Sequence, residues 1–155
     1  MDFPRRSRHA ALQRGEVNLF LDTSVLMAAC CSASGASREI FRRAALNGWN
    51  LISTPYVIEE VLRNLDRLPL AGTAEWRSIS SQLMVLGDVL TVDRPVVFAP
   101  AKDKPILFAA LAWAEVLLTL DQRDFGGLMQ RAFYGLRVIR PGEFLEAMRG
   151  AGTFR

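Results

Sequence analysis

The stretch Val17-Asn18-Leu19-Phe20-Leu21 is almost wholly apolar and runs directly into the carboxylate of Asp22. A second stretch of the same kind, Val116–Leu120, runs into Asp121. Short continuous apolar runs are typical of strands that are covered on both faces, as in a parallel sheet. Because ligands of open α/β sheets gather at the carboxyl ends of the strands, the repetition predicts two acidic side chains at one edge and indicates a cation site.

The length and composition predict one folded domain. The chain has 155 residues, half of them apolar, and a formal net charge of +3. We expect the domain to span residues 16–150, between a basic N-terminal arm (1–15) that could be disordered and a short tail (151–155). The arginines of the arm fit a frayed, solvated terminus, and an arm that attracts phosphates is the alternative. They are Arg5, Arg6, Arg8 and Arg14.

The remaining composition excludes several classes of chemistry. The basic start followed by an apolar run imitates a secretion signal, but Asp22 interrupts that run, so we expect a cytoplasmic protein with no membrane segment. Cys30 and Cys31 are adjacent, which predicts two buried thiols and no disulfide framework. His9 is the only histidine and lies in the arm, so catalysis must rest on carboxylates.

Hydrophobic periodicity predicts strands that alternate with helices. The predicted strands are Val17–Leu21, Trp49–Ser53, Val89–Val92, Val116–Leu120 and Leu136–Ile139. The predicted helices are 25–29, one ending at 47–48, 55–65, one holding Trp76 to Leu86 and ended by Gly87, 104–114, a short one after Asp124, and 141–149. Such alternation is typical of βαβ units with right-handed crossovers, and hence of an α/β fold with a mostly parallel sheet.

Four acidic residues could share one rim of this sheet. Asp22 and Asp121 follow strands, Asp103 begins a helix, and Glu60 lies in the first turns of the helix after the second strand. Each alone is explained as a cap that complements a helix dipole, but the set as a whole is less easily explained that way. Hard cations such as Mg²⁺ and Mn²⁺ prefer oxygen ligands, and clustered carboxylates repel one another until a cation enters. Such a centre polarises phosphoryl oxygens and activates water.

The motifs together resemble a PIN domain over nearly the whole chain. The resemblance is carried by Leu19–Leu26, the helix of Glu60, Asp103–Leu111 and Leu118–Phe125. Leu136–Phe144 is similar to the last strand and helix of bacterial PIN proteins regarded as toxins of toxin–antitoxin systems, the VapC type. The resemblance implies a three-layer α/β/α sandwich around a parallel sheet of four to five strands. It also implies a cytoplasmic Mg²⁺- or Mn²⁺-dependent endoribonuclease.

The resemblance also assigns the site residues. The acidic quartet that would hold metal and catalyse the reaction is Asp22, Glu60, Asp103 and Asp121. Asp124 would be an accessory acid, and the hydroxyls of Thr119 and Ser24 would steady the carboxylates or bound water. The expected partners are an RNA substrate, a cognate antitoxin and a second copy of the chain, with no membrane.

Two departures from the family pattern leave alternatives open. Glu59 stands beside Glu60, and the spacing to Leu65 favours Glu60. Two lysines flank Asp103, where many relatives are acid-rich. They could lower its pKa and hold RNA phosphates, or they could be solvated charges. The possible phosphate contacts are Lys102, Lys104 and Arg123.

Two rival functions remain. One is a non-catalytic PIN-fold module that binds RNA or a partner protein. The other is an aspartyl-phosphate phosphatase of the haloacid dehalogenase type, which also places an aspartate after the first strand. That enzyme needs a second aspartate two positions on, where this chain has Ser24, and covalent phosphoryl chemistry is therefore disfavoured.

Overall fold

The computed structural model describes residues 16–98 and 100–152. The predicted basic arm and the last three residues of the predicted tail lie outside the described residues. Within the described residues, no helix combines the length and the apolar character needed to span a bilayer.

A five-stranded parallel sheet forms the centre of the fold, in the order β3-β2-β1-β4-β5. The strands are β1 (Val17–Leu21), β2 (Trp49–Ser53), β3 (Met84–Val85), β4 (Val116–Leu118) and β5 (Arg137–Ile139). β1 is the middle strand: Leu19 is in register with Leu51 of β2, and Phe20 is in register with Leu117 of β4. The predicted α/β class and parallel sheet are confirmed.

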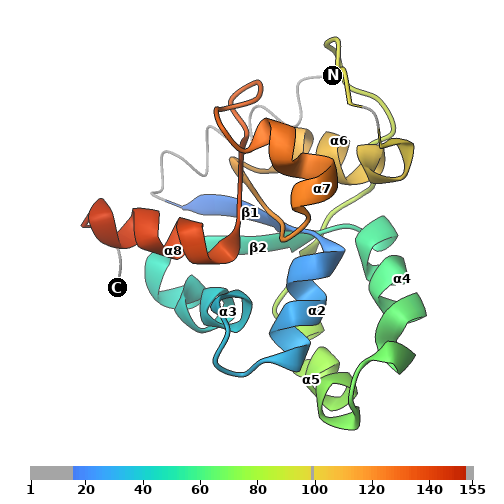
Figure 1. Ribbon diagram of the computed structural model, residues 1–155, viewed down its shortest axis with the longest axis vertical. Helices are drawn as coiled ribbons and strands as arrows, with labels where there is room; N and C mark the ends of the chain where they lie inside the picture. The colour runs from blue at the N-terminus through green and yellow to red at the C-terminus, as the bar shows by residue number, and fades with distance from the viewer. Residues whose placement is uncertain (1–15, 99, 153–155) are drawn as a thin grey trace.

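Helices cover both faces of the sheet. They are α2 (Thr23–Cys31), α3 (Ala36–Asn47), α4 (Pro55–Asn64), α5 (Leu70–Ser81), α6 (Lys104–Trp113), α7 (Gln122–Phe125) and α8 (Pro141–Gly150). Three short 3₁₀ turns join them: η1 (Leu65–Arg67), η2 (Ala101–Asp103) and η3 (Gly126–Leu128). In Figure 1, α2, α3 and α5 lie on one side of the sheet, and α6 and α7 lie on the other. This is the three-layer arrangement that the resemblance implies.

Local sequence explains where the helices begin and end. Pro55 occupies the first turn of α4, where its fixed φ suits the helix and its missing N–H is not needed, and Val57 and Val61 form the buried face. Gly48 ends α3 in the left-handed conformation (φ 68°), which a residue without a Cβ adopts readily, and the chain turns at once into β2.

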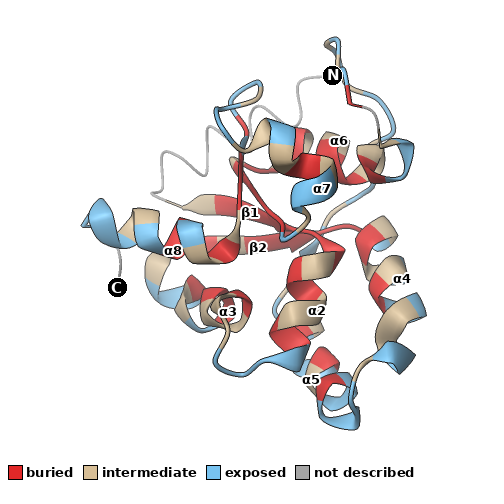
Figure 2. Ribbon diagram, in the orientation of Figure 1, coloured by how far each residue is buried: buried red, intermediate tan, exposed pale blue. Residues whose placement is uncertain are grey.

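The core lies between the sheet and its helices. Phe20 of β1 and Leu117 of β4 are fully buried, as are Leu26 of α2 and Leu107 of α6. Figure 2 shows β1 and β2 largely buried, whereas exposed residues lie on the outer surfaces of α5 and α8. The two central strands are therefore covered on both faces, as their continuous apolar sequence predicts.

The prediction for the third strand was wrong. α5 ends at Ser81, earlier than Gly87, and β3 is the two-residue strand Met84–Val85, whereas residues 89–92 form no strand. Met84 pairs with Ile52 of β2, and the backbone N–H of Leu86 donates to Ser53 O (2.9 Å). Pairing with β2 therefore overrides the helical spacing that Leu83 and Leu86 continue in the sequence.

Two smaller predictions also need correction. The short helix α7 begins at Gln122 and contains Asp124, because Asp121 caps it from the preceding position. Cys30 is buried as expected, but Cys31 is exposed at the end of α2. A helix packed on one face turns successive residues by about 100°, so the two adjacent thiols cannot both face the core.

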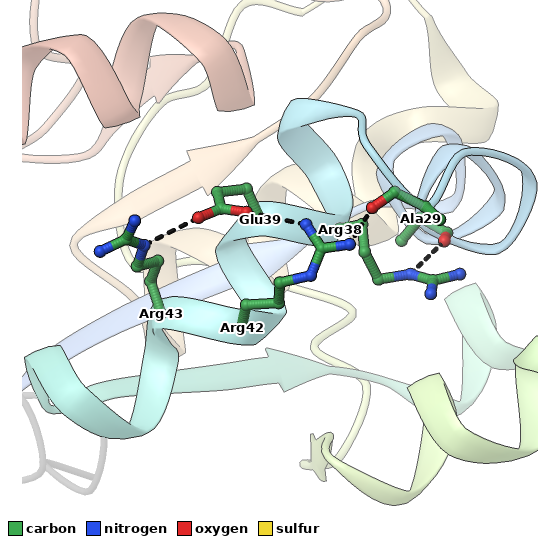
Figure 3. Close-up of polar contacts among 6 residues, drawn as sticks. Ala29, Arg38, Glu39, Arg42 and Arg43 are labelled. Carbon is green, nitrogen blue, oxygen red and sulfur yellow. Dashed lines mark hydrogen bonds and ion pairs between the residues drawn. The ribbon is translucent and has the colours of Figure 1, made fainter.

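Arg38 ties the C-terminal end of α2 to its neighbours. Its Nε donates to the carbonyl of Ala29 at 2.6 Å, which satisfies a carbonyl of the last helical turn, as Figure 3 shows. A guanidinium nitrogen of the same side chain lies 3.3 Å from a carboxylate oxygen of Glu75 in α5. One arginine therefore joins three helices.

The outer face of α3 carries a second set of charge pairs. Glu39 accepts from Arg42 at 2.8 Å and from Arg43 at 2.7 Å, the spacings at which neighbours on a helix meet (Figure 3). Arg42 also donates to the carbonyl of Ala33 in the loop between α2 and α3. We define the arginine network as Arg38, Glu39, Arg42 and Arg43.

Candidate metal centre

Asp22 stands where β1 passes into α2, at the carboxyl edge of the sheet. It is the N-cap residue of α2: its backbone is extended, and its Oδ1 accepts from the backbone N–H of Val25 at 3.2 Å. The side chain is buried (3% exposed). Sequence alone explains this capping role, because an aspartate before a helix satisfies a free N–H.

Two hydroxyl groups connect Asp22 to the loop that follows β4. Ser24 Oγ donates to Asp22 Oδ1 at 2.5 Å and accepts from the N–H of Leu120 at 3.0 Å. Thr119 Oγ1 donates to Asp22 Oδ2 at 2.5 Å and accepts from the N–H of Asp121 at 3.0 Å. Each hydroxyl is thus oriented by a backbone donor, and both oxygens of Asp22 are held in place.

Three further carboxylates meet at the same edge. Asp103, Asp121 and Asp124 each offer an oxygen, and these oxygens all lie within 4.8 Å of one another. Asp121 precedes α7 and caps it by accepting from the N–H of Asp124 at 3.0 Å. Asp103 closes η2 and opens α6, so it approaches from a different element. We call Asp103, Asp121 and Asp124 the acidic cluster.

Asp103 is the most deeply buried member of the acidic cluster. Its side chain is 6% exposed, and its Oδ2 has no hydrogen-bond partner among the described residues. Burial, and then sharing of a proton with Asp124, raise the pKa of Asp103 to about 7. The same proton sharing lowers the pKa of Asp124. Two carboxyls so close cannot both carry full charge in the metal-free protein at neutral pH.

Burial also raises the pKa of Asp22, to about 6. The hydrogen bonds from Ser24, Thr119 and Val25 favour the charged form and act against that shift, while the negative charge of Asp121 adds to it. Asp22 is therefore held firmly in position, but its ionised form is unfavourable without a nearby positive charge. This combination is expected of a metal ligand in the metal-free protein.

The cations around the acidic cluster are few and mostly exposed. Lys102 Nζ lies 3.6 Å from an oxygen of Asp124, with the lysine side chain 76% exposed. The charges of Asp103 and Asp124 raise the pKa of Lys102. Lys104 is half-buried and Arg123 is exposed. One solvated ammonium compensates the cluster only weakly.

Glu60 lies outside the acidic cluster. Among the described residues, neither Glu60 nor Asp22 belongs to the group of carboxylates whose oxygens all lie within 4.8 Å of one another. Glu60 is half-buried whereas Glu59 is exposed, and the charge of Glu60 acts on the phenol of Tyr56, as does that of Asp103. Of the two glutamates, Glu60 therefore lies on the α4 face closer to the cluster.

The residues present fit a hard divalent cation. The acidic cluster supplies carboxylate oxygens from two separate elements, one of them buried without a partner, and Asp22 adds a held carboxylate nearby. Mg²⁺ and Mn²⁺ prefer oxygen ligands of this type, whereas the donor set contains no sulfur or imidazole. A bound cation would favour the ionised forms of Asp22 and Asp103, which burial disfavours.

Comparison with known proteins supports the fold but identifies no family. The sequence matches no known family model and no curated protein. The structure is similar to a chain in the crystal structure of VapBC2 from Rickettsia felis bound to a DNA fragment from their promoter, with a TM-score of 0.54. The similarity covers 79% of this chain and 98% of that one at 13% sequence identity. The fold is thus PIN-like, and an acidic group lies at its carboxyl edge.

Proposed function

We propose that this protein is a metal-dependent endoribonuclease that hydrolyses phosphodiester bonds in RNA. The observation that carries the proposal is the acidic cluster at the carboxyl edge of a PIN-like sheet, with a buried carboxylate oxygen of Asp103 that has no partner. Carboxylates that are buried together with only one exposed lysine as counter-charge are costly to the fold, so their presence favours a function that needs them.

Asp22, Asp103 and Asp121 are the residues proposed to hold Mg²⁺ or Mn²⁺, with Asp124 beside them and Glu60 completing the set from α4. When bound, the cation would neutralise charge on a phosphoryl oxygen and lower the pKa of a bound water. Cation entry would also displace the proton shared by Asp103 and Asp124, because ligating carboxylates must be ionised.

The other residues of the site have orienting and binding roles in this proposal. Ser24 and Thr119 keep both oxygens of Asp22 fixed, which reduces the reorganisation needed during the reaction. Lys102, which pairs with Asp124, is proposed to hold the phosphates that flank the scissile bond, together with Lys104 and Arg123.

The proposed biological role is that of the toxin component of a toxin–antitoxin system acting in the cytoplasm. It is supported by the similarity to a chain of VapBC2 and by the sequence resemblance to VapC-type proteins. An antitoxin and a second copy of the chain are the proposed protein partners.

The test is cleavage of a mixed single-stranded RNA in Mn²⁺, in Mg²⁺ and in EDTA. We compare the wild type with Asp22→Asn and, as a control, Asp66→Asn, which removes an exposed carboxylate in η1 beyond the opposite end of α4. An asparagine can keep the bonds from Ser24 and Val25 and donate to Thr119 Oγ1, so the fold should be retained.

Metal-dependent cutting by the wild type and by Asp66→Asn, but not by Asp22→Asn, would support the nuclease. Full activity of Asp22→Asn in a pure sample would contradict it. Mass spectrometry of the sample tests whether a bound antitoxin is the cause if the wild type is inactive.

A non-catalytic RNA- or protein-binding module is the second candidate. It is favoured by the ion pair of Lys102 with Asp124 and by the proton shared between Asp124 and Asp103. Both partly neutralise the acidic cluster without a metal ion. RNA binding that is equal in EDTA and Mn²⁺, with no cleavage, would support this candidate.

A further inference from the structure

We propose that Tyr56 is a positioning residue of the candidate metal centre, whose hydroxyl fixes the η2 turn and hence places Asp103 relative to α4 and Glu60. The inference rests on the proposed metal-dependent function. It concerns a side chain in the first turn of α4 that carries no charge at neutral pH and that the sequence motifs do not single out.

The phenol of Tyr56 bridges two elements of the site. Its hydroxyl donates to the carbonyl oxygen of Lys102 in η2 at 2.5 Å. Its backbone N–H donates to Asp88 Oδ1 at 3.2 Å, in the segment that follows β3. Thr54, the N-cap residue of α4, makes no side-chain capping bond. The start of α4 is thus anchored through Tyr56 at both its backbone and its side chain.

Apart from the bond from Tyr56, the η2 turn is held mainly by local backbone bonds: the Lys104 N–H donates to Ala101 O, and the Asp103 N–H donates to Pro100 O at 3.1 Å. Ala101 and Lys102 are exposed, so the turn buries little apolar surface ahead of Asp103. Pro105, in the first turn of α6, has no N–H to donate back to η2. On the preceding side, the chain is anchored where Phe98 packs on Phe125 with ring centroids 5.2 Å apart. A hydrogen bond to the Lys102 carbonyl therefore restrains a segment that core packing holds only at its ends.

Tyr56 also lies between the acids of α4 and η2. Glu60 follows Tyr56 by four residues, so the two side chains share one face of α4. Partial burial raises the pKa of the Tyr56 phenol, and the charges of Glu60 and Asp103 raise it further. Through its bond to the Lys102 carbonyl, the tyrosine joins the helix that carries Glu60 to the turn that ends at Asp103.

The same bond affects the cation of the site. The Lys102 residue whose carbonyl accepts from Tyr56 also approaches Asp124 with its ammonium group, at 3.6 Å. If the hydroxyl is removed, the turn can shift, and both the Asp103 oxygen and the Lys102 ammonium move with it. Coordination by Mg²⁺ or Mn²⁺ is sensitive to such displacements because the ligand distances are short and fixed.

The experiment measures Mn²⁺ binding to Tyr56→Phe by titration calorimetry and by the electron paramagnetic resonance of free Mn²⁺. The chain offers a matched control in its other tyrosine, since the hydroxyl of Tyr134 donates to the carbonyl of Pro95 at 2.7 Å. Tyr134→Phe removes a hydroxyl that donates to Pro95, in the segment between β3 and η2, and leaves the bond to Lys102 in η2 intact. Thermal unfolding of all three proteins reports any change in stability.

We expect Tyr56→Phe to weaken Mn²⁺ binding by about tenfold, the lower end of the range for residues that orient metal ligands. Tyr134→Phe should bind Mn²⁺ as the wild type does, even where both variants lose similar thermal stability. Equal Mn²⁺ affinity of Tyr56→Phe and the wild type would overturn the inference and leave Tyr56 a structural tie.

The result separates this inference from the proposed function. Weaker Mn²⁺ binding by Tyr56→Phe, in a protein whose wild type cuts no RNA, would support the positioning role and refute the nuclease. Absence of Mn²⁺ binding by the wild type would overturn the positioning role together with the metal centre.

Discussion

The two ends of α2 carry charge in opposite ways. At its N-terminus, the buried carboxylate of Asp22 feels the charge of Asp121, one of the three carboxylates of the acidic cluster, where one exposed lysine pairs with Asp124. Beyond its C-terminus, the arginine network pairs each positive group that Figure 3 draws with a carboxylate or a backbone carbonyl. One helix thus joins a region of weakly compensated negative charge to a region of matched opposite charge.

The difference separates a stabilising arrangement from a functional one. Matched pairs lower the pKa of Glu39, whereas burial, with a smaller effect from neighbouring acids, raises those of Asp22 and Asp103. The first shift means that folding favours the charged form, and the second means that folding opposes it. Groups that the fold opposes are retained when they serve another purpose, and here that purpose is proposed to be metal binding.

The largest loss of activity should come from removing an acid of the acidic cluster, and removing an acid of the arginine network is the matched control. Asp103→Asn should lower metal-dependent RNA cleavage by about a thousandfold, because it removes a buried ligand that supports the cation's several kcal/mol of charge stabilisation. Glu39→Gln should leave cleavage and Mn²⁺ binding unchanged. Initial cleavage rates and calorimetric titration measure both. Similar losses in the two variants would erase the proposed distinction between the regions.

Stability should respond to pH in opposite directions at the two ends. Asp22 has a folded-state pKa of about 6 against an ordinary 3.8, so its contribution is complete below 3.8 and lost as the pH rises through 6. The loss is about 3 kcal/mol, from 1.36 kcal/mol per pKa unit. Glu39, with a lowered pKa, stabilises the fold at higher pH instead.

Urea unfolding of the wild type and Asp22→Asn in EDTA, at pH 4 and pH 8, tests this expectation. Asp22→Asn should lose less stability than the wild type between the two pH values. An equal loss in both proteins would show that Asp22 is not the group responsible.

Metal affinity should rise with pH. Because the pKa of Asp103 is about 7, a cation must displace its proton below that pH. Mn²⁺ binding should therefore strengthen by up to about tenfold per pH unit as the pH rises from 6 to 7, and then level off. Titrations in two buffers of different ionisation enthalpy count the protons released. Affinity that does not change with pH would argue against Asp103 as a ligand.

The smallest effects should come from the arginine network. Arg38→Ala should destabilise the fold by about 1–2 kcal/mol, since a largely buried side chain loses a charged hydrogen bond and an ion pair. Arg42→Ala should have an effect below about 1 kcal/mol, because its pair is half in solvent. Urea midpoints measure both. A fall in Mn²⁺ affinity in either variant would contradict the expectation that the arginine network affects stability and not metal binding.

Particular residues show how far sequence reasoning reached. Asp22 was placed correctly at the end of β1, because a continuous apolar run marks a buried strand and the next polar residue lies at its edge. The strand before Asp121 ends earlier than predicted, at Leu118, and Asp121 caps α7 instead. The third strand was misplaced because its two residues are half-exposed at an edge and pair with β2 only in the folded chain. Local pattern carries little information about such a strand.

The membership of the acidic group was harder to predict. Asp124 was expected to be accessory, yet its oxygen lies in the acidic cluster with those of Asp103 and Asp121, while Glu60 lies outside it. Sequence spacing shows which residues share an edge but not which oxygens approach within a few ångströms. Tyr56 carries no acidic signal, and only its hydrogen bond to η2 draws attention to it.

The sequence by itself determined the α/β class, the central strands and the carboxylates that follow them, because burial and capping are set by neighbouring residues. The tertiary structure decided what depends on strand order. Thr119 meets Asp22 across 97 residues because β4 lies beside β1 in the sheet. The tertiary structure also decided that one carboxylate oxygen of Asp103 lacks a partner and that the pKa values of Asp22 and Asp103 rise, since both follow from burial by distant parts of the chain.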